Sequence, residues 1–252
     1  MHIVRPADEE GCLPVIFYLH GGCWVMGDAR TYDRLLRELA TGVRAAVVFT
    51  EFGLVPELPY FEQLEQAYAA LTFMAGNAGQ LGLDASRIAL AGDCTGAGAA
   101  TSLALLAKRR RGPELAFQLL LYPVVRPPLG NAGSGAKDRW WFTGDALSKR
   151  VNQAFPPGMP HQDPIVCPLY ATPLQLNDLP EAMVLVAECD VACEDGEEYA
   201  RRLREAGVSV ICVRYNGAIH DFMLLNVLAE SPAARSALSQ AIEALRGALY
   251  RP

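Results

Sequence analysis

The feature that most constrains this chain is a glycine-framed turn between an apolar run and a helical pattern. Residues 87–91 have the length and apolar character of a buried strand. Residues 95–111 carry small side chains, then leucines at helical spacing, and end in basic residues, the charge that a helix C-terminus favours. Gly92 and Gly96 lie two positions on either side of Cys94. This arrangement predicts a sharp strand-to-helix turn with Cys94 at its strained, exposed apex.

Apolar runs of strand length alternate with helical patterns along most of the chain. The strand-like runs are residues 14–19, 45–49, 117–122, 183–187 and 208–214, and the helical patterns are residues 31–41, 60–75, 195–205 and 232–249. Such alternation predicts the α/β class: a doubly wound, mainly parallel sheet with ligand chemistry at the carboxyl ends of its strands. With 252 residues, 51% of them hydrophobic, residues 1–252 are expected to form a single domain.

Regular patterning fails between residues 127 and 180, where glycine, proline and aromatic residues crowd together. A stretch of this length is too long for an ordinary connection in a compact domain. We therefore expect residues 127–180 to form a short lid or cap inserted in the domain. Trp140, Trp141 and Phe142 could line an apolar pocket there, although aromatic residues in a loop often serve packing alone.

The charge balance excludes two classes of partner. A net charge of −6 and an isoelectric point near 5.3 give no electrostatic footprint for nucleic acid. Residues 88–107 are nearly uncharged and as long as a membrane span, but Asp93 and the glycines argue against a spanning helix. We expect no stable membrane insertion.

The N-terminal residues and the cysteines indicate a reducing compartment. Residues 1–10 contain no apolar core of the kind that a signal peptide needs. Seven cysteines, an odd number, then favour reduced thiols and a cytoplasmic location. Cys189 and Cys193 lack a second Cys/His pair, so neither a metal site nor a cofactor is expected.

A nucleophile at the turn requires a base, and the chain contains four histidines. His2 lies in a terminus that we expect to be frayed, and His161 lies among prolines of the expected lid. His20 precedes a glycine pair and is better suited to shaping a loop. His220 follows the last expected strand and would lie at the functional edge of the sheet, so it is the candidate base.

The base in turn needs a carboxylate, which fixes its tautomer and stabilises the imidazolium. Asp190 follows the expected strand 183–187 and is the first candidate, with Glu194 and Asp195 as alternatives. Acidic residues at a helix start are common for electrostatic reasons alone, so Asp190 is preferred. The order nucleophile, acid, base agrees with that of α/β-hydrolases.

Together these residues resemble the hormone-sensitive-lipase family of α/β-hydrolases, which includes bacterial esterases. Residues 20–23 read His-Gly-Gly-Cys where the family has His-Gly-Gly-Gly. Residues 92–97 read Gly-Asp-Cys-Thr-Gly-Ala where the family has Gly-Asp-Ser-Ala-Gly-Gly, and residues 219–222 match its histidine motif. The resemblance extends from about residue 14 to the C-terminus.

The resemblance implies an α/β-hydrolase fold and a role for each motif. The backbone amides of Gly22, Cys23 and Thr95 would form an oxyanion hole, whose donors stabilise charge that develops in the transition state. Cys23 replaces a glycine, and its thiol is assigned no role. We expect a supporting role for His20, Gly21, Asp93 and Glu194.

The departure that matters most is Cys94, which stands where the family has its nucleophilic serine. A helix N-terminus and a neighbouring imidazolium can lower a thiol pKa to roughly 3.5–7.5. We therefore expect a thiolate–imidazolium pair of Cys94 and His220. Such a pair could attack a carboxylic ester, thioester or lactone and form an acyl-thioenzyme intermediate that water then hydrolyses.

Two other functions remain open at this point. Another nucleophile can intercept a thioester intermediate, so the same Cys94 could serve an acyl transferase or a cyclase. Alternatively, the cysteine could mark a weakly active or binding-only protein, including an engineered Ser-to-Cys form. In each case the expected partner is a small-molecule acyl compound, and a homodimer is conceivable because similar proteins are often dimeric.

Overall fold

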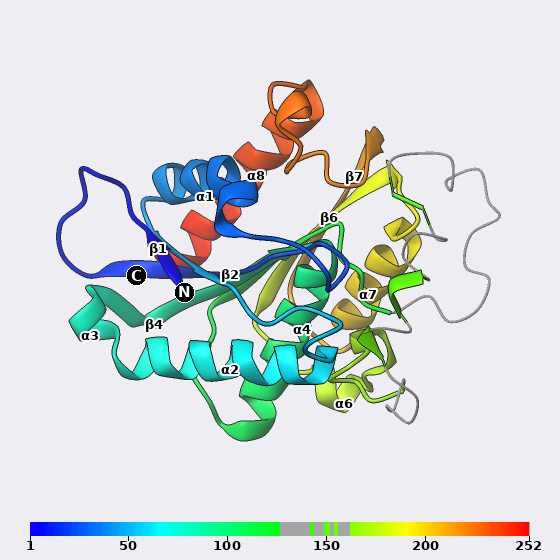
Figure 1. Ribbon diagram of the computed structural model, residues 1–252, viewed down its shortest axis with the longest axis horizontal. Coiled ribbons are helices and arrows are strands. Elements are labelled where there is room, and N and C mark those ends of the chain that lie inside the picture. The colour runs from blue at the N-terminus through cyan, green and yellow to red at the C-terminus, as the bar shows by residue number, and fades with distance from the viewer. Residues whose placement is uncertain (127–141, 144–148, 152–153, 156–161, 252) are drawn as a thin grey trace.

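The computed structural model describes residues 1–126, 142–143, 149–151, 154–155 and 162–251, and a seven-stranded sheet crosses its centre (Figure 1). The strands are β1 (His2–Val4), β2 (Leu13–Leu19), β3 (Ala46–Thr50), β4 (Leu83–Asp93), β5 (Phe117–Leu121), β6 (Glu181–Cys189) and β7 (Val210–Ile219). Their order in the sheet is β1-β3-β2-β4-β5-β6-β7, and every neighbouring pair is parallel except β1 with β3. This confirms the doubly wound, mainly parallel sheet of an α/β-hydrolase fold.

Helices cover both faces of the sheet. They are α1 (Ala29–Val43), α2 (Tyr60–Gly76), α3 (Ala78–Leu81), α4 (Cys94–Arg110), α6 (Pro173–Leu176), α7 (Cys193–Glu205) and α8 (Pro232–Leu249), with 3₁₀ turns η2 (Pro168–Tyr170) and η3 (Asn226–Leu228). Helices α1 and α8 pack together on one face, and α2 packs on α4 at the other (Figure 1). Local signals set the helix starts: the Asp28 side chain caps α1, and Ser231 followed by Pro232 begins α8.

The central strand β4 delivers Cys94 to the carboxyl edge of the sheet. Its last six residues are buried, as expected of a strand with helices on both faces. A Cβ on Gly96 would lie 2.2 Å from the carbonyl oxygen of Leu19, and one on Gly92 would lie 2.6 Å from the carbonyl oxygen of Gly96. The predicted need for glycine at both positions is therefore confirmed, because α4 could not otherwise approach the strands so closely.

The prediction of a frayed N-terminus was wrong. Residues 2–4 form β1 and pair antiparallel with β3, and Nε2 of His2 lies 3.0 Å from Oε2 of Glu51. A three-residue strand at the sheet edge is too short to give a periodic signal. Strand β7 also extends to Ile219, beyond the expected end at Arg214. Residues 215–217 of this edge strand are half-buried or exposed, so no apolar run marks the extension in the sequence.

Much of the expected lid lies outside the described residues, including Trp140, Trp141 and His161. Within the described part, Phe142 is buried, and residues 162–180 contain η2 and α6. The lid over residues 127–180 therefore stays a prediction.

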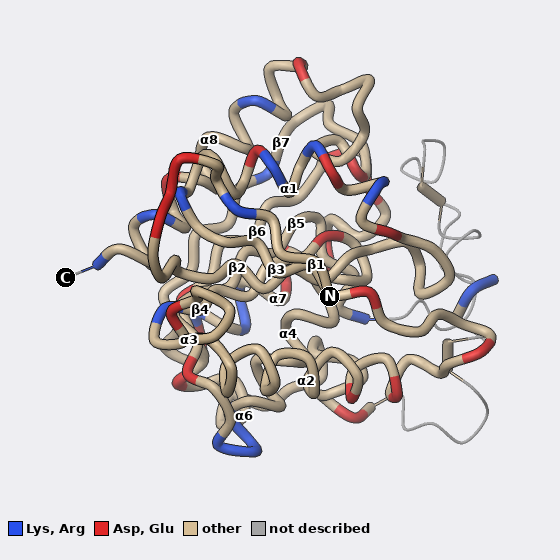
Figure 2. Tube along the Cα trace, turned by 60° about the vertical axis from the view of Figure 1, so that its left-hand side comes forward, with Lys and Arg blue, Asp and Glu red and all other residues tan. Residues whose placement is uncertain are grey.

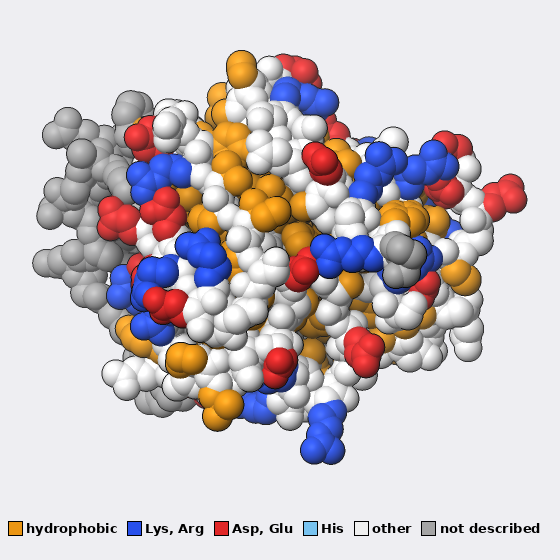
Figure 3. Space-filling model, turned by 180° about the vertical axis from the view of Figure 1, so that it is seen from behind, with side chains coloured by type: hydrophobic (Ala, Val, Ile, Leu, Met, Phe, Trp, Pro, Cys, Tyr) orange, Lys and Arg blue, Asp and Glu red, His pale blue; other side chains and the backbone are white. Residues whose placement is uncertain are grey.

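Charged residues of both signs are interspersed over the described surface. Figure 2 shows blue and red segments scattered along a mostly uncharged trace, and Figure 3 shows hydrophobic side chains exposed between charged ones on the rear face. Among the helices that the structure describes, none has the length and apolar character of a membrane span.

Candidate active site

Cys94 occupies the apex of the turn from β4 into α4. Its φ of 52° lies in the left-handed region, which non-glycine residues seldom adopt. The residue is 3% exposed, and its carbonyl oxygen accepts a 2.9 Å hydrogen bond from the amide of Val124. The strained turn that the glycine spacing predicts is present, although the thiol is buried rather than exposed.

Asp190 and His220 are brought together by the register of two neighbouring strands. Cys189 of β6 pairs with Ile219 of β7, so the next residue of each strand emerges at the same point of the sheet edge. Nδ1 of His220 donates a 2.7 Å hydrogen bond to Oδ2 of Asp190, and both side chains are buried. The other carboxylate oxygen of Asp190 accepts from the amide of Ala192 at 2.9 Å.

The two alternative acids lie elsewhere. Asp195 forms an ion pair with Arg126, with 2.7 Å between Oδ1 and Nη2. Glu194 lies in the first turn of α7. Asp190 is thus the expected candidate that contacts the imidazole.

The carboxylates around His220 make its imidazole a strong base. Burial lowers the pKa of His220, but the charges of Asp190 and Asp221 and the hydrogen bond to Asp190 outweigh burial, so the pKa lies well above its ordinary value. Oδ1 of Asp221 lies 3.6 Å from Nε2. Since Nδ1 is bonded to Asp190, Nε2 is the ring nitrogen left to exchange a proton with Cys94.

The pKa of Cys94 departs from its ordinary value in the direction opposite to the expected one. A side-chain hydrogen bond with Cys23, followed by burial, raises the pKa of the Cys94 thiol well above its ordinary value. The charge of His220 and a hydrogen bond with it lower the pKa but do not outweigh the first two causes. The thiol of Cys23, which had no assigned role, therefore favours the protonated form of Cys94.

Two aromatic rings contact the imidazole of His220, and neither was expected at the site from the sequence. The ring of Phe142 stacks on His220 with centroids 4.0 Å apart and planes inclined by 16°. Tyr122 meets His220 edge-on at 5.1 Å. An aromatic cluster in the expected lid was the only sequence signal for Phe142, and none pointed to Tyr122.

The loop of residues 20–23 carries the candidate oxyanion donors. Gly22 and Cys23 have φ values of 102° and 53°, which turn the loop back after β2. The backbone amides of Gly22, Cys23 and Thr95 donate to no acceptor among the described residues. For Thr95 this follows from its place in the first turn of α4, where amides have no intrahelical partner.

Asp93 joins this loop to the elbow. Its Oδ1 accepts hydrogen bonds from the amide of Gly21 at 3.1 Å and from the hydroxyl of Tyr18 at 3.0 Å. Its Oδ2 accepts a 2.9 Å hydrogen bond from the hydroxyl of Tyr32. The same hydroxyl oxygen accepts a hydrogen bond from the amide of Gly21. Burial, followed by the charge of Asp221, raises the pKa of Asp93 to about 7. The supporting role of Asp93 came from its motif, but nothing in the sequence indicated the two tyrosines.

His20 shapes the loop, as its position before two glycines suggested. Its Nδ1 donates a 2.8 Å hydrogen bond to the carbonyl of Gly21, and its ring stacks on Phe52 with centroids 4.4 Å apart. Burial lowers the pKa of His20, which favours the neutral ring. A Cβ on Gly27 would lie 2.2 Å from Nδ1, so the chain returns directly against the imidazole.

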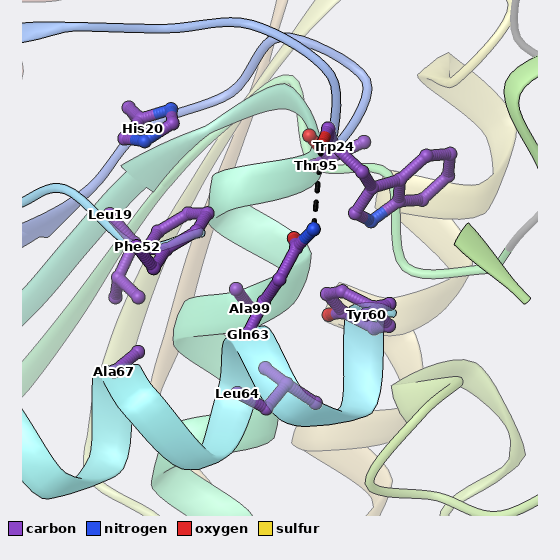
Figure 4. Close-up of a pocket in the computed structure, with 10 residues that line it drawn as sticks. All are labelled: Leu19, His20, Trp24, Phe52, Tyr60, Gln63, Leu64, Ala67, Thr95 and Ala99. Atoms are coloured by element: carbon purple, nitrogen blue, oxygen red, sulfur yellow. Dashed lines mark hydrogen bonds between the residues drawn. The ribbon is translucent and has the colours of Figure 1, made fainter. Parts of the chain in front are cut away.

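A narrow pocket adjoins Thr95 (Figure 4). Trp24, Phe52 and Tyr60 form part of its largely apolar wall, and the side chain of Gln63 reaches across to the carbonyl of Trp24 at 3.4 Å. The cavity volume of about 10 Å³ is roughly the room of one water molecule. Any group admitted here without movement of the walls is small.

Comparison with known proteins gives a family and a set of relatives. Residues 16–224 match the alpha/beta hydrolase fold family. The chain is 36% identical to a carboxylesterase of Mycobacterium tuberculosis, over 94% of this chain and 75% of the relative. It is 31% identical to an ethyl acetate hydrolase of Pseudomonas putida, over 98% of this chain and 77% of the relative.

A solved structure agrees closely. The crystal structure of a thermostable esterase from Pseudomonas putida superposes with a TM-score of 0.94 at 39% identity, covering 99% of this chain and 79% of that one. The sheet order, the elbow and the match over most of the chain lead to the same conclusion. This chain belongs to the alpha/beta hydrolase fold family.

Proposed function

We propose that the protein is a carboxylic-ester hydrolase whose nucleophile is the thiol of Cys94. The observation that carries this proposal is the buried 2.7 Å contact between Asp190 and His220 beside a cysteine held at φ 52°. The esterases among its relatives support the reaction class. The cysteine as nucleophile is this chain's own feature and rests on its residues.

The first half-reaction transfers the acyl group to sulfur. Because the thiol is protonated at rest, it passes its proton to Nε2 of His220 while sulfur attacks the ester carbonyl. The amides of Gly22, Cys23 and Thr95 would donate to the oxygen that becomes negatively charged. Collapse of the tetrahedral intermediate breaks the ester C–O bond, and the imidazolium gives its proton to the departing alcohol.

The second half-reaction releases the acid. His220 takes a proton from water as the water oxygen attacks the thioester carbonyl, and the same amides would stabilise the second oxyanion. The C–S bond then breaks, and sulfur regains a proton from the imidazolium. Asp190 keeps the ring oriented and stabilises its positive charge in both steps.

Short acyl groups are the substrates that the pocket favours. The walls formed by Trp24, Phe52 and Tyr60 leave little space beside Thr95, so a methyl-sized group fits better than a long chain. The similarity to an ethyl acetate hydrolase points to the same class of ester.

The test is a series of p-nitrophenyl esters of increasing acyl length, with acid-quenched samples read by mass spectrometry. We expect turnover to be highest for acetate, an acyl adduct on Cys94, and no turnover in Cys94→Ala. Cys212→Ser, at a half-buried cysteine on β7, serves as the matched control and should keep full activity. An equally active Cys94→Ala variant would show that the elbow is not the catalytic site.

The same samples separate the two rival functions. With an added amine or thiol acceptor, an acyl transferase would pass most of the acyl group to the acceptor instead of water. A binding-only protein would retain the ester without releasing p-nitrophenol. We expect hydrolysis to dominate in both comparisons.

A further inference from the structure

Two thiols meet at the centre of the site. Cys23 follows β2 in the oxyanion loop and Cys94 follows β4, and these strands are neighbours with Leu19 opposite Gly92. The side chains of Cys23 and Cys94 are hydrogen-bonded to each other. A disulfide would replace a contact that already exists.

The residues on both sides of the pair also lie near one another. A Cβ placed on Gly21 would lie 2.8 Å from the Cβ of Cys94, so the loop runs directly against the elbow. Trp24 and Thr95, the residues that follow the two cysteines in sequence, line one pocket (Figure 4). Disulfides need Cβ atoms about 3.5–4.5 Å apart, and where the backbone brings two cysteines into side-chain contact, rotation about χ1 can turn the sulfur atoms toward each other.

The two thiols differ in access. Cys23 is half-buried, whereas Cys94 is buried. A small disulfide from solution can thus reach Cys23 first. Cys94 is buried and has His220 as its base. Redox-sensitive cysteines commonly consist of such an exposed thiol and a second thiol that resolves it.

We propose that Cys23 and Cys94 form a reversible disulfide in the presence of a low-molecular-weight disulfide, which blocks the nucleophile. The effect on ester hydrolysis rests on the proposed function, whereas the formation of the bond does not.

Two exchange steps account for all atoms and electrons. The thiolate of Cys23, its proton lost to water, attacks one sulfur of the small disulfide; a mixed disulfide forms and one small thiolate leaves and takes up a proton. The thiol of Cys94 then gives its proton to His220 and attacks the sulfur of Cys23. The bond to the small group breaks, and the second small thiol departs with that proton. The two protein thiols are oxidised, and the small disulfide is reduced to two thiols.

The experiment treats the reduced protein with oxidised glutathione, alkylates the remaining thiols and maps the digested peptides by mass spectrometry. We expect a cross-linked peptide pair containing Cys23 and Cys94 that is lighter by two hydrogens (about 2 Da) than the sum of its two reduced peptides, and loss of ester hydrolysis. Dithiothreitol should restore the activity. The matched variant Cys212→Ser should behave in the same way as the unaltered chain.

Two variants test the order of the steps. Cys94→Ser should retain one glutathione on Cys23, because no second thiol is present to displace it. Cys23→Ser should form no disulfide at Cys94 and should lose much less of its own starting activity in oxidised glutathione.

The proposal is overturned if Cys94 is recovered alkylated after treatment while Cys23 carries a lasting glutathione. Because the peptide map does not depend on hydrolysis, the two proposals fail separately. A Cys23–Cys94 disulfide in a chain with no esterase activity would refute the proposed function alone.

Discussion

The backbone amide of Gly21 donates a 3.1 Å hydrogen bond to Oδ1 of Asp93, the residue directly before Cys94. The loop that carries the oxyanion donors is therefore bonded to the elbow that carries the nucleophile. The hydroxyl of Tyr18 donates to the same oxygen, and the hydroxyl of Tyr32 donates to Oδ2 of the same carboxyl group. Asp93 is a positioning residue that acts through the backbone on either side of it.

The buried carboxyl group of Asp93 should make stability depend on pH. Its pKa of about 7 in the folded chain exceeds the ordinary value near 3.8. Below about pH 4 the carboxyl group is protonated in both the folded and the unfolded state. Between about pH 4 and pH 7 it ionises only in the unfolded state, so the free energy of unfolding falls by about 4 kcal/mol as the pH rises. Above about pH 7 the group is ionised in both states and the free energy of unfolding levels off. Urea unfolding across this range should show the decline.

Asp93→Asn is the matching variant, since it keeps the shape of the side chain without a titratable proton. Its free energy of unfolding should decline less between pH 4 and pH 7 than that of the unaltered chain. Two parallel curves would contradict a raised pKa at Asp93.

The raised pKa of His220 should appear in the pH dependence of kcat/KM. The imidazole accepts a proton only when neutral, so activity should be lost below its pKa and the acidic limb should lie above pH 6.5. Asp190→Asn should move this limb to lower pH and reduce kcat by about 10³–10⁴-fold. Asp195→Asn is the control, because Asp195 pairs with Arg126 instead; an equal loss in that variant would exchange the roles of the two acids.

Alkylation should report the thiol pKa of Cys94. Because iodoacetamide reacts with the thiolate, labelling of Cys94 at neutral pH should be slower than that of the exposed Cys12. Cys23→Gly removes the first cause of the raised pKa and suits the left-handed φ of 53°, so labelling of Cys94 should accelerate about tenfold for each unit by which the pKa falls. An unchanged rate would mean that burial alone holds the proton.

Arg34 should stabilise the segment that follows His220. From α1 its guanidinium donates to the carbonyls of Met223 and Leu224 and to the side chain of Asn226. Arg34→Ala should lower the free energy of unfolding by about 1.5–3 kcal/mol and reduce kcat as this segment loosens.

Arg37→Ala is the control on the same helix, because Arg37 forms an exposed ion pair with Asp33. Its stability should change by no more than about 0.5 kcal/mol. If the two variants lose equal stability in thermal melts, the contacts of Arg34 contribute nothing beyond those of a surface pair.

The repeating parts of the fold could be predicted because burial imposes a period on the sequence. The helix expected at residues 232–249 has those bounds, as Ser231 and Pro232 mark its start. The elbow could be predicted from Gly92 and Gly96, because a Cβ at either position would clash with neighbouring backbone atoms. Strand β1 has no comparable sequence signal, since three residues at a sheet edge are held by backbone pairing with β3.

The electrostatics of the site could not be predicted from spacing. The direction of the Cys94 pKa depends on Cys23, and their contact arises only when the loop after β2 folds back on the elbow. The tyrosines on Asp93 and the ring of Phe142 over His220 come from distant parts of the chain in the same way. Motif reasoning selects the residue types, whereas long-range folding decides their protonation.

The pairing of Cys189 with Ile219 has a consequence for how such a chain can change over evolutionary time. A single-residue insertion in β6 or β7 would turn the following side chain to the opposite face of the sheet and separate Asp190 from His220. Between the Ala187–Tyr215 and Cys189–Ile219 pairs, β7 advances four residues while β6 advances two, an even difference that keeps the face of the next side chain. Odd insertions in this part of the strands would therefore not be tolerated, whereas the loops beyond the strands can change in length. The pairing of Cys189 with Ile219 thus preserves the distance between Asp190 and His220, while the surrounding loops can vary in sequence.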